Sequence, residues 1–194
     1  MELRKLGDLG LKLSTGQIQA RKECKGSEEA TFPCPVLVPR AIEDGTVNRA
    51  YLSSFRASRE MKDELKLTKE GDIVIKCSTP YNACIIREGE EGLFIPSFCI
   101  LIENDGATID SYYLLAFLNS KMARDTLSSC GVGQLTIINK KILGDLVIPC
   151  APLEEQRLVG ERYRKSIEKA KSLKRILELE EEWRESYFEG GEAL

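Results

Sequence analysis

The chain has 194 residues, of which 42% are hydrophobic and 30% are charged, and this balance excludes an intrinsically disordered protein. Its net charge of −3 does not by itself indicate nucleic-acid binding, and no apolar run approaches the roughly 20 residues that a membrane-spanning helix needs. The N-terminal residues lack the apolar core of a signal peptide, so we expect a cytoplasmic protein.

The sequence contains no histidine, which is the residue that most often acts as a general base or activates a serine or cysteine nucleophile. Its seven cysteines are odd in number, and no two have Cys-x-x-Cys spacing. Several of them, such as Cys99, lie in apolar runs where a free thiol packs like a small hydrophobic side chain. We therefore expect core cysteines, no metal site and no cofactor, and hydrolytic chemistry is disfavoured.

The N-terminal third of the chain predicts few regular elements. Residues 2–9 have the spacing of a short amphipathic helix, and the polar, turn-rich segment 14–33 is typical of a long exposed loop. A short buried strand is expected at 36–38, before a turn at Asp44–Gly45. The following polar segment, 57–72, has the spacing of a helix.

The middle of the chain contains apolar runs that are separated by turns. They predict strands at 72–77 and 83–88, and one or two more strands within 92–103. Apolar residues at helical spacing cover 110–131, where Asp110 is a suitable N-cap. A glycine-containing loop, a short helix or turn and a closing strand follow, so the first 150 residues indicate an α+β domain with a mixed sheet and short helices.

The C-terminal part predicts one long helix. Pro152 suits the first turn of a helix, and the two glutamates after Leu153 suit the positive end of the helix dipole. About 36 residues at 1.5 Å each span roughly 55 Å, whereas a domain of about 150 residues is only roughly 30 Å across. Apolar residues recur every three or four positions along this helix: Tyr163, Ile167, Ala170, Leu173, Leu177, Trp183 and Tyr187.

Because one domain cannot cover the whole helix, we expect this stripe to pair with a partner helix as a coiled coil. The alternative is a helix that folds back partly on its own domain and frays at its end. The chain then divides into a globular domain at 1–150, a dimerisation and spacer helix at 151–189 and a tail at 190–194.

Six stretches along the chain carry a resemblance to a known family. They are "LRKLGDLGLKLSTG" (3–16), "FPCPVLVPRAIEDGTV" (32–47), "LTKEGDIVIKCST" (67–79), "IPSFCILI" (95–102), "IDSYYLLAFLNS" (109–120) and "GVGQLTIINKKILGDLVIPCAPLEEQRLV" (131–159). In this order the chain resembles one half of the specificity subunit of a type I restriction-modification system. Each full-length subunit of that family has two target recognition domains and two long helices, whereas this chain has one of each. The chain also has "STPYNA" where the family usually has a glycine-containing loop.

The resemblance implies a non-catalytic subunit that binds double-stranded DNA and directs an adenine methyltransferase subunit and a restriction subunit to the target site. It also implies pairing through the long helix, with a second copy or another half-subunit. Polar and basic loop residues are the candidates for DNA contact: Gln19, Arg21, Arg40, Arg56, Arg59, Lys76, Ser78, Thr79, Tyr81, Asn82, Gln134, Thr136, Lys140 and Lys141. We expect phosphate contacts from Lys140 and Lys141, and base or groove contacts from the loop at 78–82.

Two other functions compete with this interpretation. The motif "STPY" (78–81) resembles the Asp/Asn/Ser-Pro-Pro-Tyr/Phe motif of adenine methyltransferases, with Tyr81 as the stacking aromatic. However, it has threonine in place of the first proline, and the chain lacks a glycine-rich cofactor-binding turn, which disfavours an autonomous methyltransferase. The second alternative is an adaptor that does not bind DNA and dimerises through its helix. If the chain is not a methyltransferase, Tyr81 is an exposed aromatic on a recognition loop or packs at the base of that loop.

Overall fold

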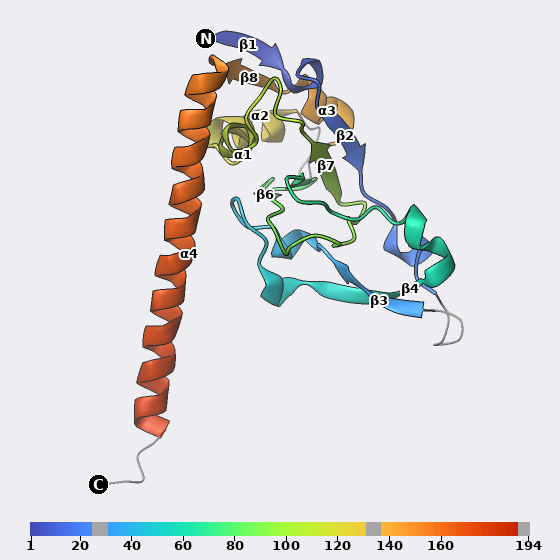
Figure 1. Ribbon diagram of the computed structural model, residues 1–194, viewed down its shortest axis with the longest axis vertical. Coiled ribbons are helices and arrows are strands. Elements are labelled where there is room, and N and C mark those ends of the chain that lie inside the picture. The colour runs from blue at the N-terminus through green and yellow to red at the C-terminus, as the bar shows by residue number, and fades with distance from the viewer. Residues whose placement is uncertain (25–30, 131–136, 190–194) are drawn as a thin grey trace.

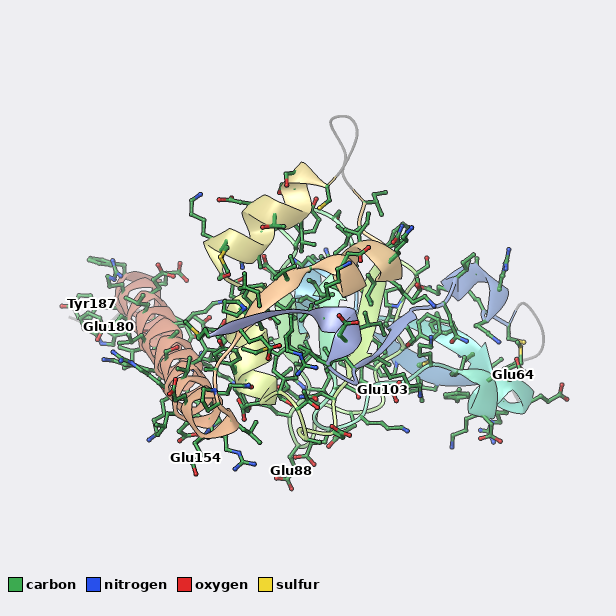
Figure 2. The ribbon with its side chains drawn as sticks, turned by 90° about the horizontal axis from the view of Figure 1, so that it is seen from above. Glu64, Glu88, Glu103, Glu154, Glu180 and Tyr187 are labelled. Atoms are coloured by element: carbon green, nitrogen blue, oxygen red, sulfur yellow. The ribbon has the colours of Figure 1, made fainter. Side chains whose placement is uncertain are left out.

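The computed structural model describes residues 1–24, 31–130 and 137–189. It consists of an α+β domain and one long helix that stands along one side of this domain (Figure 1). That helix, α4, covers Leu153–Glu189, so the predicted long C-terminal helix is confirmed. Viewed from above, Glu154 and Tyr187 of α4 lie at one side of the molecule and Glu64 lies at the opposite side (Figure 2). No helix in the described ranges is long and apolar enough to cross a membrane.

The centre of the domain is a four-stranded antiparallel sheet in the order β2-β7-β5-β6. Its strands are β2 (Lys12–Thr15), β7 (Cys99–Glu103), β5 (Ile73–Lys76) and β6 (Ala83–Ile85). Both faces of the sheet are covered, since Ile73 and Ile75 belong to one hydrophobic cluster and Val74 belongs to the other. Burial on both faces explains the continuous apolar run in β5. The strands predicted at 72–77 and 83–88 are confirmed.

A second, two-stranded sheet pairs the first strand of the domain with its last strand. It consists of β1 (Glu2–Lys5), followed by a 3₁₀ helix at Leu6–Asp8, and β8 (Val147–Cys150). The predicted closing strand is confirmed as β8, but the helix predicted at 2–9 is wrong. The reason is tertiary: the Leu6 amide donates a hydrogen bond to the Leu146 carbonyl at 3.0 Å, and the Leu6 side chain is fully buried. These contacts with distant residues outweigh a weak local helix pattern.

A third sheet is a hairpin that lies at the side away from α4 (Figure 1). It consists of β3 (Thr31–Val36) and β4 (Ser53–Ser58), with short 3₁₀ helices at Gln19–Arg21, Pro39–Ala41, Arg49–Tyr51 and Arg59–Glu64 around it. The helix predicted at 57–72 is therefore wrong, because its first residues continue β4 and the next ones form only 3₁₀ turns. Phe55 of β4 packs edge-to-face on Phe94, with ring centroids 5.0 Å apart. This aromatic pair favours the strand.

Three short helices complete the domain. They are α1 (Ser111–Leu118), α2 (Lys121–Ser129) and α3 (Lys140–Asp145). The predicted N-cap is confirmed, since the Asp110 carboxylate accepts a hydrogen bond from the Tyr113 amide at 2.9 Å. The single helix predicted at 110–131 is interrupted at Asn119, because the Ser120 hydroxyl caps a new helix by accepting from the Ala123 amide.

Only the first half of α4 packs on the domain. The Gln156 side chain is buried there and accepts a hydrogen bond from the Asp110 amide at 3.0 Å. Tyr163 is half-buried and Ile167 is buried, and both pack against the main hydrophobic cluster. The predicted stripe is therefore not one surface for a partner: Tyr163 and Ile167 are used within the chain, whereas residues from Ala170 onward are exposed.

Four of the free cysteines, Cys34, Cys77, Cys84 and Cys99, are buried, as expected for core thiols. Burial raises the pKa of Cys77 to about 11 and that of Cys84 to about 12, and it also raises the pKa of Cys99. In the described part of the chain, no three Cys, Asp or Glu side chains are placed to hold a metal ion.

Candidate nucleic-acid interface

Four segments that are far apart in the sequence meet at one end of the four-stranded sheet. Strand β7 begins there at Cys99, whose carbonyl accepts a hydrogen bond from the Gly16 amide at 3.0 Å, just after β2. The Cys77 amide, just after β5, donates to the Phe98 carbonyl at 2.9 Å. The Cys77 carbonyl in turn accepts from the Ile138 amide at 2.8 Å. We call the segments 16–24, 77–82, 96–98 and 137–141 together the loop end of the sheet.

Gly16 makes the close contact between two of these segments possible. A Cβ atom at this position would lie 2.1 Å from the Pro96 carbonyl oxygen, which is far inside the distance that real Cβ atoms adopt. The Gln17 amide then donates to the Ile95 carbonyl at 2.8 Å. The first loop therefore begins at a fixed position, which is the requirement for a loop that presents side chains to a ligand.

The loop at 77–82 presents fewer side chains than its sequence suggests. Ser78 and Thr79 are exposed. Tyr81 has 0% exposure and a φ of 55°, and its ring belongs to the main hydrophobic cluster, so the expected DNA contact by this ring does not agree with the structure. The ring packs at the base of the loop instead. Asn82 is half-buried, and its side-chain oxygen is enclosed without a hydrogen-bond partner among the described residues.

Lysine side chains gather beside this loop. Lys140 and Lys141 open α3, both are exposed, and neither forms an ion pair within the described residues. Lys66 donates a hydrogen bond from Nζ to the Thr15 carbonyl at 2.6 Å. Burial lowers the pKa of Lys66, and the nearby charges of Lys140 and Lys12 lower it further, while Glu103 opposes them. The loop end of the sheet therefore presents the positive charges of Lys140 and Lys141, with Lys66 near Lys140.

Sequence reasoning missed Lys66. Its backbone amide donates to the Gln17 side-chain oxygen at 2.7 Å, and this contact brings it to the loop end. Nothing in the local sequence distinguishes Lys66 from the other lysines of its polar segment. The sequence predicts Lys76 instead, but Lys76 is half-buried, and burial lowers its pKa while the nearby Asp44 carboxylate opposes this shift.

A second group of candidates surrounds the β3–β4 hairpin. The Cys24 amide donates to the Arg56 carbonyl at 2.9 Å, so the first loop runs from the sheet end to this hairpin. Arg56 and Arg59 are exposed but donate hydrogen bonds to Thr31, the former at 3.0 Å to the hydroxyl and the latter at 3.3 Å to the carbonyl. Arg21 is exposed beside them. Arg56 and Arg59 are therefore held at fixed positions beside the β3–β4 hairpin.

The remaining candidates lie elsewhere. Gln19 is half-buried in the 3₁₀ helix of the first loop. The Arg40 guanidinium lies over the Tyr51 ring, 5.6 Å from its centroid, in the segment 39–51. Gln134 and Thr136 lie outside the described residues.

The long helix α4 has an exposed apolar face that points away from the domain. At about 100° per residue, Leu158, Leu173, Ile176, Trp183 and Tyr187 all lie within roughly 60° of the direction opposite to the buried Ile167. Each of these five side chains is exposed, Trp183 by 61%. The Trp183 and Tyr187 rings lie 5.7 Å apart at the end of this face.

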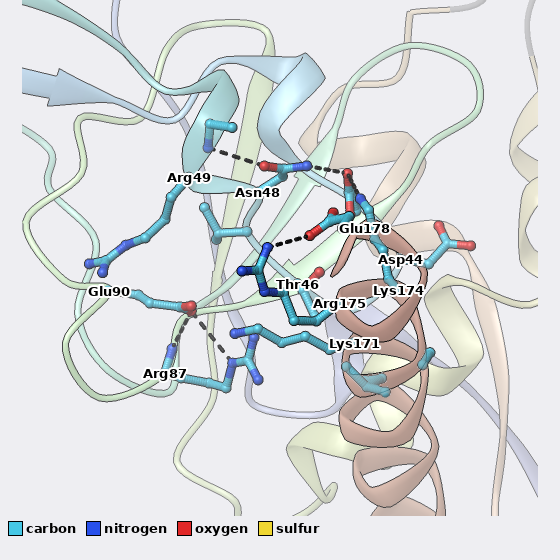
Figure 3. Close-up of a pocket in the computed structure, with 15 residues that line it drawn as sticks. Asp44, Thr46, Asn48, Arg49, Arg87, Glu90, Lys171, Lys174, Arg175 and Glu178 are labelled. Atoms are coloured by element: carbon cyan, nitrogen blue, oxygen red, sulfur yellow. Dashed lines mark hydrogen bonds and ion pairs between the residues drawn. The ribbon is translucent and has the colours of Figure 1, made fainter. Parts of the chain in front are cut away.

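A groove separates the middle of α4 from the segments 43–50 and 87–90 (Figure 3). Its volume is about 550 Å³, and its walls are held by ion pairs. Lys174 of α4 lies 3.5 Å from Glu43, and Arg87 lies 3.6 Å from Glu90. Because the charges along this groove are largely paired, we assign it to the attachment of α4 to the domain.

Comparison with known proteins gives a match at the level of structure. No family model and no curated protein matches the sequence. A structure of a type I R-M system, described for its complex assembly and conformational transition, superposes with a TM-score of 0.59 at 19% identity over 95% of this chain and 43% of that one. The HsdS subunit from Thermoanaerobacter tengcongensis gives a TM-score of 0.54 at 17% identity, over 90% of this chain and 39% of that one.

A third structure is the type I restriction-modification S subunit from M. genitalium. It gives a TM-score of 0.60 at 16% identity and covers 96% of this chain and 44% of that one. The chain therefore spans less than half the length of the proteins it matches. Domain and long helix together have the fold of one part of a type I restriction-modification specificity subunit.

Proposed function

We propose that this chain is a sequence-specific DNA-recognition subunit of a type I restriction-modification system. In this role it directs an adenine methyltransferase and a restriction nuclease to the target site and has no catalytic activity of its own. The observation that carries the proposal is the match in fold to specificity subunits over at least 90% of the chain. The loop end of the sheet, with exposed hydrogen-bonding side chains beside lysines, supports it.

Within this function, residues 1–150 are the target recognition domain. Ser78 and Thr79 contact base edges, because their side chains are exposed on a loop with a fixed base. Lys66, Lys140 and Lys141 contact phosphates, since they add positive charge beside that loop. Residues 151–189 are the spacer and pairing helix.

Selection from a library of randomised DNA duplexes tests the recognition function. The chain should enrich a defined motif, and its affinity should fall steeply as the salt concentration rises. Failure to enrich any motif would favour the alternative, an adaptor that pairs through its helix without binding DNA. A two-fold dimer should enrich an interrupted palindrome, because each copy reads the same half-site in inverted orientation.

The second copy, in this proposal, pairs with the outward face of α4. If two such helices run antiparallel, with Ser172 opposite the partner's Leu173, then Leu158 meets the partner's Tyr187. Arg162 then meets the partner's Trp183, which allows a cation–π contact. Lys165 meets the partner's Glu180, which unites opposite charges.

Parallel pairing in register would set like charges against each other, Lys165 against Lys165 and Glu180 against Glu180. The antiparallel arrangement is therefore favoured by charge as well as by apolar burial. In this arrangement the exposed aromatic end of each helix covers the exposed Leu158 of the other.

Charge reversal tests this pairing. Lys165→Glu and Glu180→Lys should each make the chain monomeric in light scattering, whereas an equal mixture of the two variants should form heterodimers because both charge pairs are then restored. Glu181→Lys, which has the same charge change but lies about 100° away around the helix, is the matched control and should dimerise. Dimerisation of both single variants like the unmodified chain would rule out this register, and a monomeric unmodified chain would rule out the pairing itself.

A further inference from the structure

Phe98 is the most conspicuous unexplained side chain at the loop end of the sheet. Its side chain is 64% exposed, although Cys99, the next residue in the chain, and Cys77, whose amide bonds to the Phe98 carbonyl, are both buried. Ile137, which lies next to the segment that contacts Cys77, is 63% exposed. Single exposed hydrophobic residues are normal, but two large ones around one backbone position, in a region otherwise made of polar loops, suggest a binding surface.

The backbone around Phe98 fixes its outward direction. Its carbonyl accepts from the Cys77 amide at 2.9 Å, and the Cys99 amide closes the turn by donating to the Pro96 carbonyl at 3.0 Å. Phe98 is the third residue of this turn, before β7 begins, and its side chain is 64% exposed. The ring is therefore presented to solvent from a rigid position.

The surroundings of Phe98 indicate which kind of partner suits it. Thr79 lies two residues beyond Cys77 and is exposed. The Ile138 amide also donates to the Cys77 carbonyl, and Ile138 precedes Lys140 and Lys141 at the start of α3, which are exposed and form no ion pair within the described residues. An apolar ring on a turn whose backbone neighbours carry exposed hydroxyl groups and lysines matches the major groove of DNA, where thymine offers a methyl group between phosphate rows.

We propose that Phe98, flanked by Ile137, contacts a thymine methyl group in the major groove and so determines one position of the recognised sequence. This inference rests on the proposed DNA-recognition function. It adds an apolar contact between the Phe98 ring and one base to the hydrogen bonds expected there. The hydroxyl groups of Ser78 and Thr79 then supply hydrogen bonds to neighbouring base edges.

The test uses the full chain and a randomised duplex library, with the variants Phe98→Ala and Leu3→Ala. Leu3 is the matched control, because it is also exposed but lies on β1, in a different sheet. The unmodified chain and Leu3→Ala should enrich the same motif with a required thymine. Phe98→Ala should enrich a motif that has lost its preference at that position and keeps the others. Circular dichroism and thermal melting should be unchanged, since the ring is outside the core.

Replacement of that thymine by deoxyuridine, which removes only the methyl group, sharpens the test. It should weaken binding of the unmodified chain about three- to fivefold and leave the affinity of Phe98→Ala unchanged. An unaltered motif for Phe98→Ala, or an equal deoxyuridine penalty in both proteins, would overturn the inference while the recognition function stands. An unaltered motif with weaker capture of the methyltransferase subunit would instead assign Phe98 to a protein interface. If the unmodified chain enriches no motif, both the inference and the proposed function fail.

Discussion

The side-chain amide of Asn119 donates a hydrogen bond to the Tyr163 hydroxyl at 3.2 Å, and this contact ties the end of α1 to α4. The same amide donates to the Ala83 carbonyl at 2.9 Å, and its oxygen accepts from the Ala83 amide at 2.9 Å. One side chain therefore joins a helix of the domain, the edge strand β6 and the long helix. It helps to position α4 on the domain, together with the hydrogen bond between Gln156 and the Asp110 amide and the burial of Ile167.

Asn119→Ala should lower the free energy of unfolding more than Tyr163→Phe does. The alanine variant leaves the buried Ala83 amide without a partner, while the Ala83 carbonyl keeps the Gly45 amide as a donor, so we expect a cost of about 1–3 kcal/mol. The phenylalanine variant loses one hydrogen bond, worth about 0.5–1.5 kcal/mol. Urea denaturation followed by circular dichroism measures both values. If both variants lose the same free energy of unfolding, the stability comes from the hydrogen bond between Asn119 and Tyr163, and not from the two hydrogen bonds between Asn119 and Ala83.

Gly160→Ala should destabilise the docking of α4, although alanine favours helices. A Cβ atom at Gly160 would lie 2.1 Å from the Asp110 carboxylate and 3.0 Å from the Tyr113 amide, where α1 begins. We expect the steric overlap to lower the free energy of unfolding by about 1–3 kcal/mol, whereas the better helix propensity of alanine raises it by about 1 kcal/mol. Gly144→Ala in α3 is the control, because its Cβ would meet nothing closer than 3.7 Å. Thermal melting that shows both variants to be stabilised would contradict the close contact.

Lys140→Ala and Lys141→Ala should weaken binding to all duplexes about equally. If each lysine contacts one phosphate, each variant should reduce the slope of log affinity against log salt by about one unit. Fluorescence anisotropy on cognate and scrambled duplexes at several salt concentrations measures this slope. Lys121→Ala, on α2 and already paired with Asp125, should leave it unchanged. A loss confined to the cognate duplex would assign these lysines to base contacts.

Thr79→Ala should weaken binding to the cognate duplex by about 1–3 kcal/mol and have little effect on scrambled DNA, as expected for a base-edge contact. Asn82→Ala, in the same loop, should have a smaller effect, because the Asn82 side-chain oxygen is enclosed. The same anisotropy titrations compare the two variants. An equal loss on both duplexes for Thr79→Ala would place the loop against the phosphates.

The buried thiols should be protected in the folded chain. At about pH 8 a thiol-reactive dye should label the exposed Cys130 rapidly and leave Cys77 and Cys84 unlabelled, because burial blocks access and a pKa of about 11 or 12 keeps them protonated. Labelling followed by peptide mass analysis, with and without urea, checks this. Rapid labelling of Cys84 without denaturant would indicate local opening of β6.

Local sequence determined several elements of this protein. The helix from Leu153 onward follows from a long run without proline after Pro152, because helix formation depends on contacts within a few residues. The cap at Asp110 and the apolar strand β5 follow from equally local chemistry. The ordered set of short motifs also indicated the family whose fold the structure matches.

The tertiary structure decided what depends on contacts between distant residues. Pairing of β1 with β8 replaced a predicted helix, and burial of Tyr81 removed an expected DNA contact. The stripe along α4 was divided by packing, since the domain covers Tyr163 and Ile167 and leaves the opposite face free. Hydrogen bonds at Cys77 placed Phe98 among the polar loops, and no spacing in the sequence encodes that position, because it arises from strands that pair across long stretches of chain.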